Sequence, residues 1–317
     1  MCFMNESGIG SNGVAMSERS ATLTPSMAVE WPTVRLAGVC YLGVIIALWI
    51  LPTWAAIIVL GPIIALHASL SHEVVHGHPF ANQTLNAALV FPALTLVVPY
   101  ARFRATHLAH HRDEHLTDPY DDPESNYLEP AVWVRLALPA RALLRFNNRL
   151  LGRLLIGPLL GQFMWMANDL RACRAGERVV IWGWVAHIPA VAVVVALVWA
   201  APLPFWAYAM GAYIGHAIVR IRTFLEHRAH DLARARTVIV EDRGLLALLF
   251  LNNNLHVVHH MHPCVAWYDL PALYASNRAH YLRRNDGYVF ASYGAVFRRH
   301  FWNAKDPVPH PLWHKDD

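Results

Sequence analysis

The stretch "THLAHHRDEHLTDPYDDPES", Thr106 to Ser125, holds four histidines and six carboxylate residues within twenty positions. A second stretch, "NNNLHVVHHMHP" from Asn252 to Pro263, repeats the H-x-x-H-H spacing about 150 residues later. Histidines three and four residues apart lie on one face of a helix. Each stretch therefore predicts a set of imidazole nitrogens directed towards one point.

The composition surrounding these histidines is that of a membrane protein. The chain has 317 residues, of which 56% are hydrophobic and only 15% are charged, and its formal net charge is +4. Soluble domains carry about 25% charged residues. This balance favours an integral membrane protein and argues against a nucleic-acid partner.

Four apolar segments are long enough to cross a bilayer. Residues 36–71 contain no Asp, Glu, Lys or Arg. One crossing needs about 20 apolar residues, and Pro52 disfavours helical geometry at the residue before it. The segment therefore predicts two helices, and a second pair flanks "APLP" at 201–204. We expect an all-α protein with four transmembrane helices in two hairpins, near residues 35–51, 53–72, 179–201 and 203–219.

The remaining segments are assigned by composition. Residues 1–30 are rich in Ser, Gly, Asn and Met, which predicts a disordered tail, and we expect residues 31–317 to form a single domain. The apolar stretch 85–101 contains two prolines, so we expect it to enter the membrane without crossing. Residues 131–178 mix arginine with leucine, which predicts amphipathic helices on the bilayer surface.

The basic residues predict the orientation. The turns at 51–53 and 201–204 contain none, whereas there are two up to Arg35, eleven in 72–178 and thirteen in 220–317. The positive-inside rule then places both termini and the regions 72–178 and 220–317 in the cytoplasm. All the histidine-rich stretches fall on that same side. We expect an integral protein of a bacterial inner membrane.

The histidine-rich stretches form three boxes: "HEVVH" at 72–76, "HLAHH" at 107–111 and "HVVHH" at 256–260. Imidazole suits iron, zinc, copper and nickel. A structural zinc takes four ligands, and the eight boxed histidines exceed that number, so two metal ions share them more naturally. The four cysteines form no C-x-x-C pair, which argues against a thiolate site.

In these boxes the sequence resembles the membrane fatty acid desaturase and hydroxylase superfamily. Its signature is three boxes of the forms H-x(3–4)-H, H-x(2–3)-H-H and (H/Q)-x(2–3)-H-H. The segments "DPYDDPES" and "NLHVVHHMHPCVAWYDLP" are also similar to the family's regions after the second box and around the third. The resemblance implies a non-haem di-iron centre that uses O2, with eight boxed ligands: His72, His76, His107, His110, His111, His256, His259 and His260.

The family often adds a histidine after the fourth span, and His227 in "TFLEHRAH" stands there. Some desaturases carry an asparagine one turn earlier, where this chain has Thr223. Further histidines lie beside the boxes, as extra ligands or as donors to ligands: His78, His115, His230 and His262. His67 and His216, within the spans, are expected to face the bundle near the metal end, whereas His187 has no assigned role.

Ligating histidines usually donate their other N–H to a carboxylate or a carbonyl. Four acidic residues are near enough in the sequence to accept these bonds or, equally, to solvate a polar surface: Glu73, Asp113, Glu226 and Asp269.

The resemblance implies an O2-dependent desaturase that introduces a double bond into an acyl chain of a membrane lipid. The chain has no G-x-G-x-x-G after a strand, no cysteine set for an iron–sulfur cluster and no H-P-G-G segment. We therefore expect electrons from a separate donor such as a ferredoxin or a cytochrome. The same ligands would serve a hydroxylase or ketolase of an acyl lipid, aminolipid or carotenoid. A non-catalytic metal transporter or sensor is the less favoured alternative.

Overall fold

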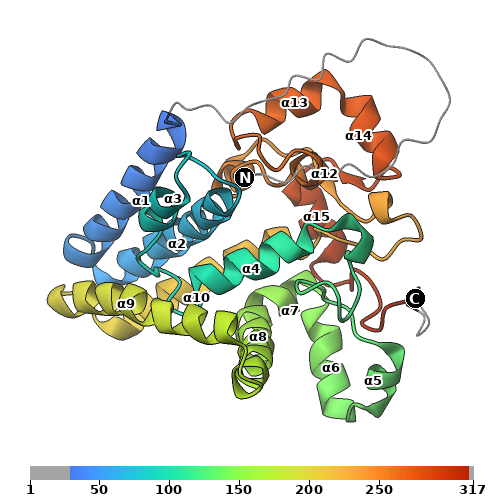
Figure 1. Cartoon of the computed structure of the whole chain (residues 1–317), viewed down its shortest axis with the longest axis horizontal. Helices are drawn as coiled ribbons and strands as arrows, with labels where there is room; N and C mark the ends of the chain where they lie inside the picture. The colour runs from blue at the N-terminus through green and yellow to red at the C-terminus, as the bar shows by residue number, and fades with distance from the viewer. Residues whose placement is uncertain (1–28, 314–317) are drawn as a thin grey trace.

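The computed structural model describes residues 29–313, apart from the side chain of Asp113. The predicted N-terminal tail thus lies outside the described residues except for Val29 and Glu30. The fold is mainly helical (Figure 1). The longest helices are α1 (Trp31–Trp49), α2 (Thr53–Val75), α8 (Gly157–Arg174), α9 (Arg178–Ala200) and α10 (Phe205–Thr223).

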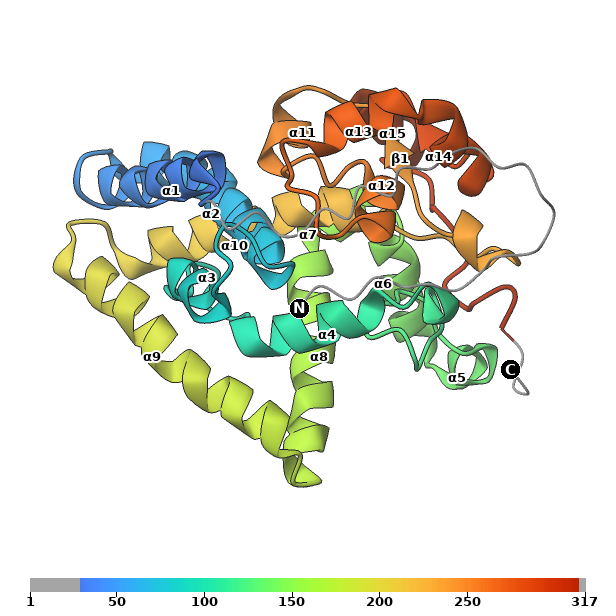
Figure 2. The ribbon, with the colours of Figure 1, turned by 45° about the horizontal axis from the view of Figure 1, so that its top comes forward.

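Shorter helices complete the described part of the chain. Those between α2 and α8 are α3 (Gln83–Leu89), α4 (Tyr100–His110), α5 (Pro130–Arg135), α6 (Leu138–Asn147) and α7 (Leu150–Leu155). Those after α10 are α11 (Leu245–Leu249), α12 (His256–Met261), α13 (Leu270–Ser276), α14 (Arg278–Arg284) and α15 (Tyr293–His300). In Figure 2, α1, α2 and α9 extend to one side, and α11 to α15 gather on the other.

Three of the four predicted spans, α1, α2 and α9, are long and apolar enough to cross a membrane. The predicted turn is present, since α1 ends at Trp49 and α2 begins at Thr53. The fourth predicted span corresponds to α10, which is 19 residues long but carries Arg220 and Arg222 in its last turn. These arginines and its other polar residues lower its hydropathy below that of α9.

Helices α2 and α10 pack closely because glycines line their contact. A Cβ built on Gly61 would lie 2.5 Å from Cγ2 of Ile214, and one on Gly211 would lie 2.6 Å from Cβ of Leu60. Small residues allow helices to approach closely in membranes, where packing replaces the hydrophobic effect. This contact fixes the end of α2, which carries the first histidine box, beside the end of α10.

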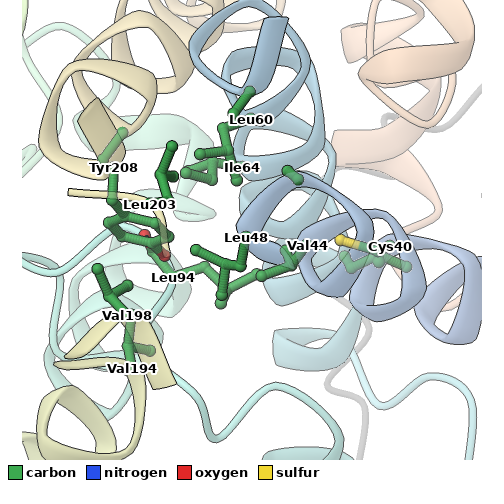
Figure 3. Close-up of a cluster of buried hydrophobic side chains, with 14 of the residues drawn as sticks. Cys40, Val44, Leu48, Leu60, Ile64, Leu94, Val194, Val198, Leu203 and Tyr208 are labelled. Carbon is green, nitrogen blue, oxygen red and sulfur yellow. The ribbon is translucent and has the colours of Figure 1, made fainter. Parts of the chain in front are cut away.

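A buried apolar cluster joins α1, α2, α9 and α10 (Figure 3). Its largest fully buried members include Leu48, Leu60, Ile64 and Tyr208. Leu94, from the segment between α3 and α4, packs into the same cluster. The outward faces of these helices are apolar as well, with Val39, Trp54 and Trp182 each more than half exposed, as expected of lipid-facing surfaces.

The proline-containing segment predicted at 85–101 is non-helical between Val90 and Pro99. Four consecutive carbonyls in it each accept a hydrogen bond from a different side chain. The pairs are Tyr208 with Leu94 at 2.8 Å, His216 with Thr95 at 3.1 Å, His187 with Leu96 at 2.9 Å, and Gln162 with Val97 at 2.8 Å. Backbone carbonyls that are removed from water need hydrogen-bond donors within the protein, and these four side chains supply them.

The region 131–178 contains helices α5 to α8, as its pattern predicts, and their location on the bilayer surface stays a prediction. The prediction of an all-α fold left out one feature. A two-stranded parallel sheet pairs β1 (Ile239–Val240) with β2 (Val289–Phe290). Each strand has only two residues and its partner lies about fifty residues away, so no period-2 pattern marks it. The sheet holds the segment before the third histidine box against the C-terminal helices.

Candidate metal centre

The three boxes lie at helix ends. His72 is in the last turn of α2 and His76 directly follows this helix, while His107 and His110 end α4 and are followed by His111. Gly77 ends α2 with a φ of +99°, the left-handed conformation that glycine adopts without a steric penalty. The third box forms α12 itself.

The nine histidines predicted from the boxes and from "TFLEHRAH" lie in two groups. The five-histidine group consists of His72, His76, His107, His111 and His259. The four-histidine group consists of His110, His227, His256 and His260. Within each group one nitrogen of every ring lies within 4.8 Å of all the others. Each group combines distant parts of the chain. The prediction that each box directs its nitrogens towards one point is wrong for the second and third boxes, because His110 and His259 each belong to the other group from the remaining histidines of their box.

The separations between ring nitrogens are short. Nε2 of His107 lies 3.1 Å from Nε2 of His76 and 3.0 Å from Nε2 of His111. In the other group, Nε2 of His227 lies 2.9 Å from that of His110 and 3.2 Å from that of His256. Imidazole nitrogens bind a metal ion at about 2.1 Å, so two neighbouring ligands of one ion lie about 3 Å apart.

The opposite ring nitrogens determine which form these imidazoles take. Nδ1 of His107 donates to Oε1 of Glu124 at 3.0 Å, and Nδ1 of His110 donates to Oδ1 of Asp122 at 2.7 Å. A neutral imidazole that carries its proton on Nδ1 presents a lone pair on Nε2. Lone pairs that face one another repel unless a cation lies between them, and this donor set therefore fits a metal ion in each group.

The electrostatic surroundings favour neutral imidazoles in most positions. Burial, together with repulsion from neighbouring histidines, holds the pKa values of His76, His227 and His259 well below the ordinary value. A neutral imidazole is the form that binds a metal. These rings would therefore be ready to bind at neutral pH.

His110 is the exception. Burial opposes its charge, but the carboxylates of Glu124 and Asp122 raise its pKa to about 9. Glu124 responds in the opposite sense, since His110 and His107 hold its pKa below the ordinary value despite its burial. The carboxylate charge that stabilises a proton on this ring would also stabilise a metal ion at Nε2, the nitrogen that faces His227.

The comparison with known families agrees with this geometry. The family model described as fatty acid desaturase matches residues 47–292, which contain all nine histidines. The chain belongs to the fatty acid desaturase family. A search of curated proteins found no match.

Several residues support the histidines of this desaturase-family chain although the sequence does not predict that role for them. Asp122 and Glu124 stand in the acidic segment "DPYDDPES". The acidic composition indicates partners for histidines, but it does not show which histidine each carboxylate contacts. Asn253 accepts from Nδ1 of His256 at 2.9 Å and its amide lies 3.3 Å from Nε2 of His72. It belongs to the run "NNN" before the third box, which carried no assigned role.

The histidines beside the boxes lie outside both groups. Nδ1 of His78 bonds Oε1 of Glu30 at 2.6 Å, and Nε2 of His230 lies 3.4 Å from Oδ2 of Asp286. The side chain of His115 is 44% exposed. His262 packs edge-on against Tyr281. The neighbours of these four side chains are thus carboxylates for His78 and His230, solvent for His115 and an aromatic ring for His262.

The predicted carboxylates also differ in position. Oε1 of Glu226 lies 3.8 Å from Nδ1 of His256 and 3.2 Å from Nε of Arg222. Glu73 is buried against the backbone of Trp267. Asp269 is exposed at the start of α13. Of these three, only Glu226 lies within ion-pairing distance of a histidine of the two groups, and the side chain of the fourth predicted carboxylate, Asp113, lies outside the described part of the chain.

A cavity of about 700 Å³ reaches the histidines. His107, His110 and His227 line it, and so does the face of α4 from Tyr100 onwards. Alanines, Val90 and Phe91 form its wall on the side of α3 and α9. This volume is within the range of ligand pockets, about 300–1,000 Å³, and the lining includes histidines of both groups.

Proposed function

We propose that the nine histidines bind two iron ions, one in each group, and that the protein is an O2-dependent desaturase of a lipid acyl chain. The iron ions supply the redox chemistry with O2 that removes hydrogen from an unactivated C–H bond, which acid–base side chains do not perform. Removal of one hydrogen from each of two neighbouring carbons leaves a double bond.

The observation that carries this proposal is the cavity that connects an apolar wall to the histidines. Ala88, Val90 and Phe91 offer no polar group to a substrate, whereas His107 and His110 lie in the same lining. An extended acyl chain on this wall would present its methylene groups to both metal sites. The protein's part is to hold the chain in register and to exclude water around it.

The convergence of the boxes supports four crossings of the membrane. His110 precedes α9 and His227 follows α10, yet their Nε2 atoms are 2.9 Å apart. If α9 crosses the bilayer, the chain must cross back before His227. Helix α10, with 19 residues and a length of about 28 Å, is the segment that does so. We propose it as the fourth span of a single domain, residues 31–317, with the termini in the cytoplasm of a bacterial inner membrane.

Electrons are proposed to come from a separate ferredoxin or cytochrome. Arg283 on α14 is exposed and adds positive charge to the face of the C-terminal helices, whereas its neighbour Arg278 is paired with Glu241. Opposite charges on two partners accelerate their encounter. An acidic donor would therefore approach the metal centre from the side that carries α13 and α14.

The test is lipid mass spectrometry of cells that produce the iron-loaded protein together with an electron donor, with cells that produce His259→Ala as the matched control. We expect an acyl lipid that has lost two hydrogens to appear only with the unaltered protein and only in the presence of O2. Position analysis of the double bond then shows which carbons lie beside the metals.

Other products would identify a different reaction. A gain of one oxygen identifies a hydroxylase, and conversion of a methylene to a carbonyl identifies a ketolase. An unchanged lipid profile with an active donor, combined with iron movement into sealed vesicles, contradicts the enzyme and identifies a transporter. Transporters place their sites near the bilayer midplane, whereas these histidines lie at helix ends.

A further inference from the structure

The cavity beside the histidines has a second wall that is basic instead of apolar. Arg153 from α7 and Arg220 from α10 line it, on the side formed by α7 and α8. An acyl chain cannot accept hydrogen bonds from guanidinium groups or compensate their charge. Burial of a charge without a partner of opposite sign costs free energy, so these two side chains require an explanation.

Arg153 is only 5% exposed, yet its hydrogen bonds go to neutral groups. Its Nη1 donates to Oδ1 of Asn126 at 2.6 Å and its Nε donates to the carbonyl of Asn147 at 3.1 Å. Burial, with Arg220 nearby, lowers the pKa of Arg153 to about 9. The protein thus offsets the positive charge on Arg153 with neutral groups and with the ring of Phe224, whose centroid lies 5.7 Å from Cζ, instead of with a carboxylate.

Arg220 has even fewer partners. Among residues 29–313, no carboxylate forms an ion pair with Arg153 or with Arg220. The neighbouring acids are engaged elsewhere, because Glu124 bonds His107 at 3.0 Å and Glu226 pairs with Arg222 at 3.2 Å. The guanidinium of Arg220 therefore faces the cavity with its donors available.

Two glycines on α8 make room for these arginines. A Cβ built on Gly161 would lie 2.5 Å from Nη2 of Arg220, and a Cβ on Gly157 would lie 2.9 Å from Cδ of Arg153. The two glycines are one helical turn apart and therefore lie on the same face of α8. The glycine face thus allows the guanidinium group of Arg220 and the aliphatic part of Arg153 to lie close to α8 beside the cavity.

We propose that Arg153 and Arg220 bind the oxyanion of the lipid substrate, a phosphate or a carboxylate, while its acyl chain lies along the apolar wall beside α3 and α9. This inference rests on the proposed function and names the chemical class of its substrate. Two guanidinium groups recognise an oxyanion by charge-assisted hydrogen bonds. A fixed head group also sets how far along the chain the metals act.

The test is a binding measurement that needs no turnover. Native mass spectrometry of the iron-loaded full chain in non-ionic detergent measures dissociation constants for didecanoyl phosphatidylglycerol, decanoate, didecanoylglycerol and inorganic phosphate. We expect at least one of the two anionic lipids to bind at least about tenfold more tightly than the neutral lipid, as one or two charge-assisted hydrogen bonds predict. Inorganic phosphate alone is expected to bind more weakly than that lipid.

The variants isolate the two arginines. Arg220→Gln and Arg153→Gln should each remove most of this preference and leave the affinity for didecanoylglycerol unchanged. Arg298→Gln, which removes an exposed arginine of α15, should keep the preference. Gly161→Ala retains every charge but displaces the guanidinium of Arg220, and it should weaken binding of the anionic lipid if Arg220→Gln does not fold.

Equal binding of neutral and anionic lipids would overturn the inference, and so would an equal loss in Arg298→Gln. Binding of phosphate as tightly as the anionic lipids would also overturn it, because the site would then serve a free anion. The proposed function fails separately. If anionic lipids are preferred but no lipid is oxidised with O2 and a donor, the inference stands and the oxidase does not.

Discussion

Histidines in two regions of this molecule perform different tasks. The nine at the helix ends direct nitrogens at one another, as His110 does to His227 at 2.9 Å. His187 and His216, on α9 and α10, direct theirs at backbone carbonyls of the 90–99 segment. The atom that each ring faces decides its role, and a carboxylate on the opposite nitrogen marks the proposed metal-binding rings His107 and His110.

The largest loss of activity and of bound iron is expected when one of the nine grouped histidines is replaced. His110→Ala should reduce lipid oxidation to the background level and lower the iron content, because it removes a nitrogen that faces His227. His78→Gln is the matched control, since His78 adjoins the first box but bonds Glu30. Iron analysis and lipid mass spectrometry measure both effects. Retention of full iron and activity in His110→Ala would contradict the assignment of His110.

A smaller loss is expected when the carboxylate behind that histidine is changed. Asp122→Asn keeps the size of the side chain but weakens its bond to Nδ1 of His110, and such partners are worth about 10- to 100-fold in metal affinity. Asp121→Asn changes the neighbouring carboxylate, whose side chain is 68% exposed, and should leave iron binding unchanged. Competition for iron with a chelator measures the difference, and equal affinities in the two variants would refute this role of Asp122.

The smallest effect is expected from the histidines that support the backbone. His187→Ala leaves the half-buried Leu96 without the donor to its carbonyl and should lower the free energy of unfolding by about 1–3 kcal/mol. Iron content should remain that of the unaltered protein. Thermal unfolding in detergent measures the loss, with the exposed His115→Ala as the reference. Loss of iron in His187→Ala without loss of stability would erase the distinction between the two regions.

The sequence was informative where chemistry follows helical spacing. The four-residue intervals correctly paired His72 with His76, His107 with His111 and His256 with His260. The three-residue intervals did not, because His110 and His259 belong to the other group. A long uncharged run with Pro52 predicted the hairpin of α1 and α2. Hydropathy identified α10 less clearly as a span, because Arg220 and Arg222 stand in its last turn. Both side chains line the interior cavity instead of lying only at a water-exposed helix end. Their role depends on the cavity, which no local pattern describes.

Contacts made by irregular backbone could not be predicted in the same way. Asp122 reaches His110 across twelve residues of turns, and helical periodicity says nothing about such a pairing. The carbonyl of Leu96 meets His187 across 91 residues, after α9 has packed beside the 90–99 segment. The small sheet joins residues 239 and 289 for the same reason. These features follow from the packing of elements instead of from their local sequence.

The most direct test of the central claim is anomalous diffraction at the iron absorption edge, from crystals of the protein purified with iron. The account predicts two anomalous peaks in each chain, one among His72, His76, His107, His111 and His259 and one among His110, His227, His256 and His260. A single peak, or peaks away from these nitrogens, would contradict a two-iron centre held by the nine histidines.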